Sequence, residues 1–340
     1  MTAARGEGPM DVETFRATFE AIRRQMQRVI VGHEALIDHT LMALLSNGHV
    51  LLEGVPGLGK TLLVKTLAQC LDLRYARIQF TPDLMPADII GTTVVLQDDA
   101  GRRYFEFQRG PIFSQIVLAD EINRATPKTQ SALLEAMQER QVSVSGAAHA
   151  LEEPFLVLAT QNPIEMEGTY PLPEAQVDRF LFKLKVDVPT IGELVEIMER
   201  TAGPPQAPPE VVATGETIRA MQVFAREVPA AEHVKTYTAR LVRATHPRDG
   251  EASSLARRYV RYGSSPRGAQ ALLVAGKVRA LMEGRTNVSV EDIAALALPA
   301  LRHRVLLNFE GEAESVDPDD IIQSIVAELP PAPATATWTS

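Results

Sequence analysis

The sequence of 340 residues contains a single cysteine, Cys70, which rules out an internal disulfide and a cysteine pair for a metal site. Its seven histidines are scattered, and none forms the i, i+4 pair with a carboxylate that is typical of a zinc site. We therefore expect no structural metal. Cys70 falls on the apolar stripe of an expected helix, and this position predicts a core residue.

Long apolar runs and an excess of basic residues are also missing. No apolar segment near the N-terminus is long enough for a secretory signal or a spanning helix, so we expect a cytoplasmic protein without membrane insertion. The formal net charge of -9 argues against a surface built to neutralise nucleic acid, although local basic patches stay possible. With 45% hydrophobic and 23% charged residues, the composition is typical of a globular protein, and its length allows two domains.

What the sequence does contain is a glycine-rich segment with the spacing G-x-x-x-x-G-K-[ST] of a phosphate-binding loop. It consists of Gly54, Val55, Pro56, Gly57, Leu58, Gly59, Lys60 and Thr61. Glycines let consecutive backbone N–H groups approach a phosphate, and the N-terminus of the following helix directs a partial positive charge at the same anion. A glycine-rich turn without a ligand is the alternative. An apolar run before the segment and a helical pattern after it favour the phosphate loop.

The last two residues of the loop have distinct predicted roles. Lys60 can reach the β- and γ-phosphates, and the Thr61 hydroxyl can join the oxygen shell of Mg²⁺. We also assign Val31 and Gly32, in an apolar turn ahead of the preceding helix, to the nucleotide site. The sequence therefore predicts ATP and Mg²⁺ as ligands.

Two carboxylates, Asp120 and Glu121, end an apolar run that is typical of a central parallel strand. In a phosphate-loop enzyme Asp120 can hold Mg²⁺, directly or through water, and Glu121 can orient and polarise the attacking water. Asn162 ends the next predicted strand, where its amide can position that water. Without the phosphate loop, a solvated strand end and a turn residue before proline would be the better interpretations.

Strands separated by helices predict an α/β fold with a parallel sheet flanked by helices, followed by an all-α lid domain. We expect a disordered N-terminus over residues 1–10, a nucleotide-binding core over 11–189, a helical lid with a proline-rich connector over 190–329, and a flexible tail over 330–340. Turn compositions predict two hairpins inserted in the core, near residues 92–107 and 141–151. One long helix is expected over residues 289–301.

Seven segments closely resemble the MoxR family of AAA+ ATPases. They are residues 54–61, 119–125, 127–139, 159–163, 167–180, 263–267 and 301–304. The resemblance covers nearly the whole chain from about residue 31 to residue 305, and the segment around Asp120 is specific to that family.

The resemblance implies a role for individual residues. The phosphate loop corresponds to Walker A, Asp120 and Glu121 to Walker B, and Asn162 to sensor 1. Arg179 is similar to the arginine finger that reaches the γ-phosphate of a neighbouring subunit, and Arg267 to the sensor 2 arginine of the lid. A guanidinium can stabilise charge that develops on a phosphoryl group because its forked donors match phosphate oxygens. Without the family, a surface salt bridge is the better interpretation of Arg179.

The resemblance also implies a function: a homo-oligomeric ring, a hexamer, that hydrolyses ATP and remodels or activates a partner with a von Willebrand factor A domain. Two alternatives share this machinery, a DNA-translocating motor like the MCM helicases and a magnesium-chelatase-like motor subunit. Arg102 and Arg103 in the first hairpin slightly favour the DNA motor, while Asp98 and Asp99 and the overall acidity oppose it. Whether Arg267 acts on its own subunit's nucleotide or its neighbour's stays open.

Overall fold

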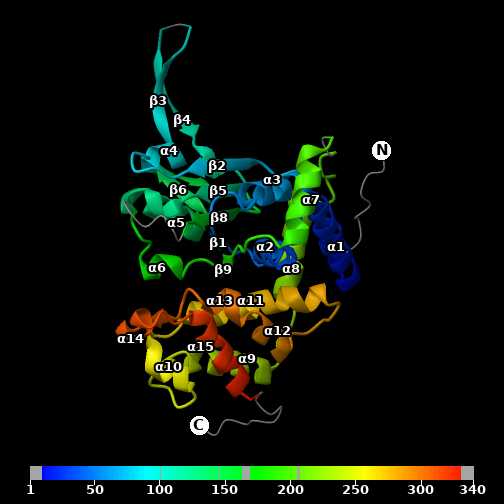
Figure 1. The fold of residues 1–340 in the computed structure, drawn as a ribbon. Coiled ribbons are helices and arrows are strands. Elements are labelled where there is room, and N and C mark those ends of the chain that lie inside the picture. Colours follow the sequence, from blue (N-terminus) through cyan, green and yellow to red (C-terminus); the bar gives the residue numbers. More distant parts are fainter. Residues whose placement is uncertain (1–9, 100, 145, 163–168, 205–206, 331–340) are drawn as a thin grey trace.

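The computed structural model describes residues 10–99, 101–144, 146–162, 169–204 and 207–330, so most of the expected disordered N-terminus and of the flexible tail lies outside it. Its core is a five-stranded parallel sheet (Figure 1). In spatial order the strands are β2 (Tyr75–Gln79), β5 (Ile116–Asp120), β8 (Leu156–Gln161), β1 (Val50–Glu53) and β9 (Phe182–Lys185). This order places the carboxyl ends of β5, β8 and β1 side by side at one edge of the sheet.

Both faces of this sheet are covered, which explains the nearly continuous apolar runs of its three central strands, β1, β5 and β8. Val50 and Leu52 belong to a core cluster formed with α1 (Val12–Val29), α2 (Glu34–Leu45) and α3 (Lys60–Cys70). Leu51 points the other way, into a cluster formed with α4 (Pro86–Ile90) and α5 (Pro127–Glu139). The expected α/β class is therefore confirmed, and Cys70 is buried in the first cluster as predicted.

Two hairpins interrupt the core close to their predicted positions. The first pairs β3 (Gly91–Gln97) with β4 (Arg103–Arg109) and projects away from the body of the molecule (Figure 1). The second pairs β6 (Gln141–Val144) with β7 (Ala147–Ala150). Their bases touch, because the rings of Phe107 and His149 stack with centroids 4.2 Å apart.

The second half of the chain is helical. It contains α7 (Ile191–Ala202), α8 (Gly215–Glu227), α9 (Glu232–Ala244), α10 (Ser254–Tyr259), α11 (Pro266–Met282), α12 (Val290–Ala295), α13 (Ala297–Leu301), α14 (Phe309–Ala313) and α15 (Pro318–Glu328). A short antiparallel pair, β10 (Val260–Tyr262) and β11 (Leu306–Leu307), lies among them. Helix α7 lies beside α1 and the core, away from α9 to α15 (Figure 1). The boundary near residue 190 stays a prediction.

The single helix expected over residues 289–301 is wrong, because the structure has two helices that meet at Leu296. Pro299 explains the break: a proline lacks the backbone N–H and its ring clashes with the carbonyl four residues earlier, which is that of Ala295. The start of α12 follows the sequence pattern, since Ser289 and Asp292 form the expected capping box. Within the described ranges, no helix has the length and apolar character needed to cross a bilayer.

Candidate nucleotide-binding site

The phosphate loop connects β1 to α3 at the carboxyl edge of the sheet. Gly57 and Gly59 have φ angles of +87° and +79°, which residues with a side chain rarely adopt, and a Cβ on either would meet no atom within 4 Å. Their backbone therefore faces open space that a phosphate can enter. Gly54 serves a different purpose, because a Cβ there would lie 2.9 Å from the Val186 carbonyl oxygen at the end of β9.

Lys60, the first residue of α3, folds back over the loop. Its ammonium donates hydrogen bonds to the carbonyl oxygens of Gly54, at 2.5 Å, and Val55, at 3.4 Å. Partial burial lowers the pKa of Lys60, while the nearby carboxylates of Asp120 and Glu121 act in the opposite direction. A phosphate at the loop would offer this half-buried cation a charged acceptor in place of neutral carbonyls.

The two carboxylates lie where β5 ends. Asp120 is the last residue of the strand, and Glu121 turns the chain with left-handed angles of φ 57° and ψ 49°. Few residues other than glycine adopt this conformation, and it is often found at functional sites. Thr160 on β8 connects the pair: its hydroxyl donates to Asp120 Oδ1 at 2.7 Å and accepts from the Glu121 N–H at 2.8 Å.

Two polar side chains on β2 contact these carboxylates, and neither was predicted from the sequence. Arg77 donates to Asp120 Oδ2 through Nη2 at 2.6 Å and Nε at 3.0 Å, and Gln79 donates to Glu121 Oε2 at 2.8 Å. Residues 77 and 79 share one face of their strand because strand side chains alternate. Only the pairing of β2 with β5, which aligns Gln79 with Asp120, brings them to the site, and nothing in the local sequence indicates that pairing.

One pocket gathers most of the predicted residues. It is lined by Pro56, Gly57, Gly59, Lys60, Thr61, Leu62, Arg77, Asp120, Glu121, Thr160 and Asn162. The pocket therefore brings together the phosphate loop, the Thr61 hydroxyl, the two carboxylates and the Asn162 amide, although these groups are up to about one hundred residues apart in the chain. The oxygens of Thr61 and Asp120 are the type of ligand that Mg²⁺ prefers.

An apolar pocket continues from the phosphate loop between α1, α2 and α7. Val31 and Leu58 line it, together with Leu36, Leu63 and Ile197 among others, and it shares Gly57, Gly59 and Leu62 with the first pocket. A flat ring joined to phosphates would fit such an apolar slot.

Gly32 takes a different place from Val31. It has a φ of +66° and is not among the residues that line the apolar pocket. A Cβ at Gly32 would lie 2.0 Å from Glu193 Oε1, so glycine there allows the N-terminal turn of α7 to pack closely.

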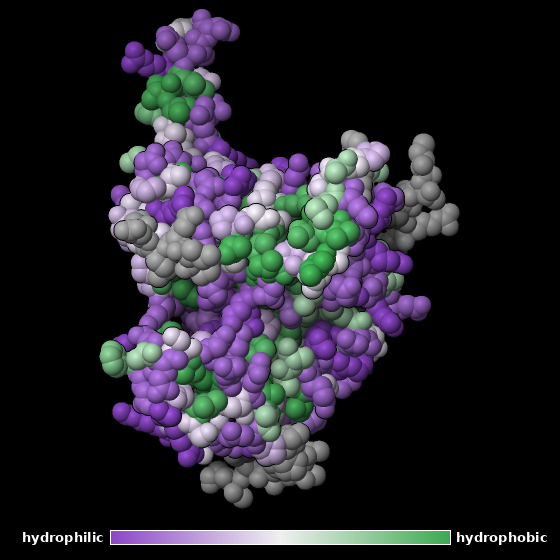
Figure 2. Space-filling model, in the orientation of Figure 1, coloured by the Kyte–Doolittle hydropathy of each residue, from purple (hydrophilic) through white to green (hydrophobic). Residues whose placement is uncertain are grey.

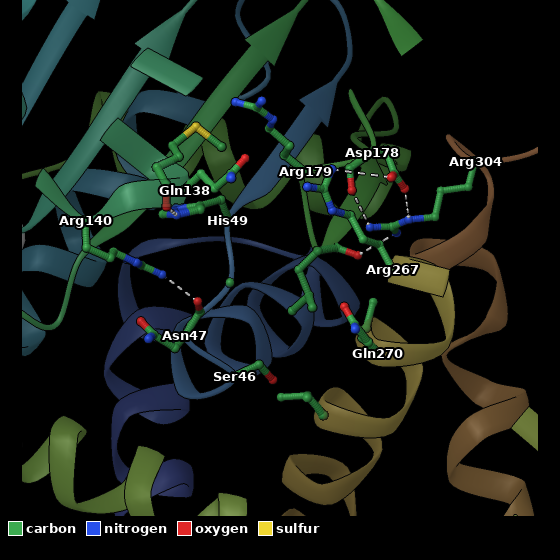
Figure 3. Close-up of a pocket in the computed structure, with 15 residues that line it drawn as sticks. Ser46, Asn47, His49, Gln138, Arg140, Asp178, Arg179, Arg267, Gln270 and Arg304 are labelled. Carbon is green, nitrogen blue, oxygen red and sulfur yellow. Dashed lines mark hydrogen bonds and ion pairs between the residues drawn. The ribbon is translucent and has the colours of Figure 1, made fainter. Parts of the chain in front are cut away.

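Arg179 and Arg267 do not line either of these pockets. They share another one, which we call the arginine pocket and which is also lined by Arg140, Arg304 and Asp178 (Figure 3). Arg179 donates to the Leu134 carbonyl oxygen at 3.1 Å, while its Nε is buried and has no partner in the described part of the chain. Arg267 lies 3.5 Å from Asp178 Oδ2.

The arginine pocket and the phosphate loop lie at opposite edges of the sheet. Arg179 lies three residues before Phe182, where β9 begins. The phosphate loop follows Glu53, where β1 ends, and β1 is the parallel neighbour of β9. The strands between them are about 10 Å long at a rise of about 3.3 Å per residue. The structure therefore brings the two predicted arginines together, but not at the nucleotide pocket of their own chain.

Comparisons with known proteins agree with this geometry. Residues 49–182 match the model of the ATPase family associated with various cellular activities (AAA), and residues 252–325 match the AAA lid domain. Chaperone MoxR1 of Mycobacterium tuberculosis is 42% identical over 309 residues, which cover 91% of this chain and 81% of the relative. Protein MoxR of Paracoccus denitrificans is 31% identical over 339 residues, which cover 94% of this chain and 98% of the relative. The crystal structure of a Cytophaga hutchinsonii protein assigned as an ATPase is 38% identical, with a TM-score of 0.88 over 95% of this chain and 97% of that one.

Proposed function

The chain belongs to the MoxR family of AAA+ ATPases, and from that premise we propose that it is an ATP-hydrolysing ring motor that remodels or activates a partner protein. Each ATP would lie between two subunits of a hexamer in the cytoplasm. The observation that carries this proposal is the position of Arg179 and Arg267 at the sheet edge opposite their own phosphate loop.

Within one subunit, the residues of the nucleotide pocket would have separate roles. The loop and Lys60 would bind the phosphates, and the apolar pocket with Val31 would take the adenine ring. Thr61 and Asp120 would hold Mg²⁺, which neutralises phosphate charge when bound. Glu121 would accept the proton of the attacking water, and Asn162 would keep that water in line.

The arginines would complete the site of the neighbouring subunit. Because the sheet separates Arg179 from its own phosphate loop, a second copy has to present its loop to this arginine. Arg267 shares the arginine pocket with Arg179, which favours action of both residues on the same neighbouring nucleotide. An arginine supplied in this way is worth roughly 10³ to 10⁵ in rate in related phosphoryl-transfer systems.

Exposed apolar surface beside the nucleotide site supports assembly. Helix α7 has no buried residue, and its side chains Ile191, Leu194, Val195 and Met198 are 86%, 49%, 43% and 53% exposed. Figure 2 shows apolar residues gathered over this part of the molecule. An apolar patch of this kind is typical of a protein interface, and a neighbouring subunit at the adjacent nucleotide pocket would cover it.

A protein partner also suits the projecting hairpin. Phe105 and its cross-strand neighbour Val95 are 78% and 55% exposed. Figure 2 shows an apolar band on this hairpin. Such side chains suit contact with a polypeptide better than contact with a phosphate backbone. We propose a von Willebrand factor A domain protein as this partner, on the basis of the family.

The test is the ATPase rate per subunit as a function of protein concentration, with the molar mass from light scattering, for the wild type and Arg179→Ala. We expect the wild-type rate to rise as an ATP-dependent oligomer forms. The variant should bind ATP and assemble but hydrolyse at least 10³-fold more slowly, because it lacks the arginine of the shared site. A monomer whose rate is independent of concentration would contradict the proposal.

A further inference from the structure

Asp178, the residue before Arg179, is where the lid meets the core. Its carboxylate accepts from the Ser265 hydroxyl at 2.9 and 3.0 Å. It also accepts from Arg304 Nε at 2.8 Å, and Arg267 lies 3.5 Å away, as Figure 3 shows for these two arginines. Ser265 is the N-cap of α11, Arg267 lies in its first turn, and Arg304 follows α13. One core carboxylate therefore binds three side chains from two parts of the lid.

Arg304 extends this connection to the backbone on both sides of Arg179. Its guanidinium donates to the carbonyl oxygens of Asp178, at 2.9 Å, Phe180, at 2.7 Å, and Leu181, at 3.3 Å. The side chain is only 2% exposed. Burial lowers the pKa of Arg304, whereas the negative charge of Asp178 acts in the opposite direction. Loss of the carboxylate would leave a buried cation without its ionic partner, which is strongly unfavourable.

Arg179 itself has few hydrogen bonds that fix its direction. Among the residues that the structure describes, its guanidinium makes one hydrogen bond, to Leu134 O, and its Nε has no partner. Its position is thus set mainly by the backbone of residues 178–181, and this is the segment that Arg304 and Asp178 hold against the lid. A shift of the lid would carry this backbone, and Arg179 with it.

We propose that Asp178 is a positioning residue that couples the lid of a subunit to the arginine serving the next nucleotide site. This inference rests on the proposed shared site. It means that the lid of one subunit sets the activity of its neighbour, so that successive sites in the ring communicate through this carboxylate.

Asp178→Asn tests the coupling, because asparagine keeps the shape and removes the charge. We expect kcat to fall at least tenfold while KM for ATP changes less than about twofold, since the variant's own nucleotide pocket is intact. The matched control is Asp317→Asn. Asp317 also joins the lid to the core, through Lys185 at 2.7 Å, but outside the arginine pocket, and its kcat should stay close to the wild-type value.

Mixed assemblies separate positioning from a general loss of structure. In an equimolar mixture with Glu121→Gln protein, Asp178→Asn subunits receive an intact arginine from half of their neighbours. The rate per subunit should recover to about a quarter of the wild-type value, because half of the subunits can hydrolyse ATP and half of those are served. A mixture of Asp178→Asn with Arg179→Ala should show no recovery above the rate of Asp178→Asn alone.

Two outcomes overturn the inference while leaving the shared site in place. One is a wild-type kcat for Asp178→Asn. The other is a mixture of Asp178→Asn with Glu121→Gln that does not recover activity, under conditions where the mixture of Arg179→Ala with Glu121→Gln does. Asp178 would then act on its own subunit's site. If the Arg179→Ala mixture fails as well, the shared site itself is wrong and the coupling is excluded with it. If Asp178→Asn does not fold, Ser265→Ala replaces it in the same mixtures, because it removes one lid contact and leaves Arg304 paired with Asp178.

Discussion

At the scale of single residues, Glu121 combines a left-handed backbone with a carboxylate held by two donors, Gln79 at 2.8 Å and Arg124 at 3.1 Å. Replacement by Gln keeps the shape but removes the base. We expect Glu121→Gln to bind ATP with unchanged affinity and to lower kcat by about 10²- to 10⁴-fold, the usual contribution of a general base. Steady-state ATPase assays and titration with a fluorescent nucleotide would measure the two effects. A wild-type rate would remove Glu121 from this role.

Lys60 should affect ATP binding and not the chemical step alone. Its ammonium lies over the phosphate loop, and hydrogen bonds to a charged group contribute about 1.5–3 kcal/mol. Lys60→Ala should therefore weaken ATP binding by about 10- to 100-fold in the same titration. Lys65→Ala, a change at an exposed position of the same helix, is the matched control and should leave the affinity unaltered. Equal affinity of the Lys60 variant and the wild type would contradict its placement in the site.

At the scale of elements, the sequence predicted each strand that ends at the nucleotide pocket, because buried parallel strands leave continuous apolar runs and the phosphate loop has a fixed spacing. It did not predict which strands are neighbours. Arg77, Gln79 and Thr160 were missed for that reason, since their contact with Asp120 and Glu121 depends on the pairing of β2 and β8 with β5. The ion pair of Asp178 with Arg304 spans 126 residues, and no local pattern indicates it.

The first hairpin depends on close backbone contact at its base. Gly91 has a φ of +95°, and a Cβ there would lie 2.1 Å from the Gln108 carbonyl oxygen and 2.6 Å from the Gly110 nitrogen. Gly91→Ala should lower the free energy of local opening at the hairpin base by about 1–3 kcal/mol, the cost of a strained backbone residue. Tryptic cleavage after Arg109 should therefore become at least about fivefold faster. Gly250→Ala, where a Cβ meets no atom within 4 Å, should leave this rate unchanged. Equal cleavage of both variants would show that the base tolerates a side chain.

At the scale of the whole molecule, the two functional edges of the sheet suggest how copies assemble. The nucleotide pocket is at one edge and the arginine pocket at the other, so a contact that joins them is heterologous and closes into a ring if its rotation permits.

The distribution of charge argues against the DNA motor. The net charge is -9, and Arg102 near the tip of the first hairpin is paired with Asp98 at 2.9 Å, which offsets its charge.

Buried histidines make the stability of the whole fold depend on pH. His49 accepts from the Val157 N–H at 3.0 Å, and its Nε2 lies 3.1 Å from Met137 O. Burial, and secondarily Arg140, lowers the pKa of His49 to about 3, and burial lowers the pKa of His303 in the same direction. Because the folded pKa is below the unfolded value near 6.5, neutral histidine favours the folded state. Its contribution is complete above pH 6.5 and is lost as the pH falls.

We therefore expect the free energy of unfolding to decrease as the pH falls from 7.5 to 5. His49 alone should account for about 2 kcal/mol of this decrease, because pH 5 lies about 1.5 units below the unfolded pKa and each unit corresponds to about 1.4 kcal/mol. Urea unfolding at the two pH values measures the change. His49→Gln keeps a donor for Met137 O and an acceptor for the Val157 N–H but does not titrate, so its loss of stability between the two pH values should be smaller by about the same 2 kcal/mol. If the wild type and the variant lose equal stability, protonation of His49 on unfolding does not cause the pH dependence.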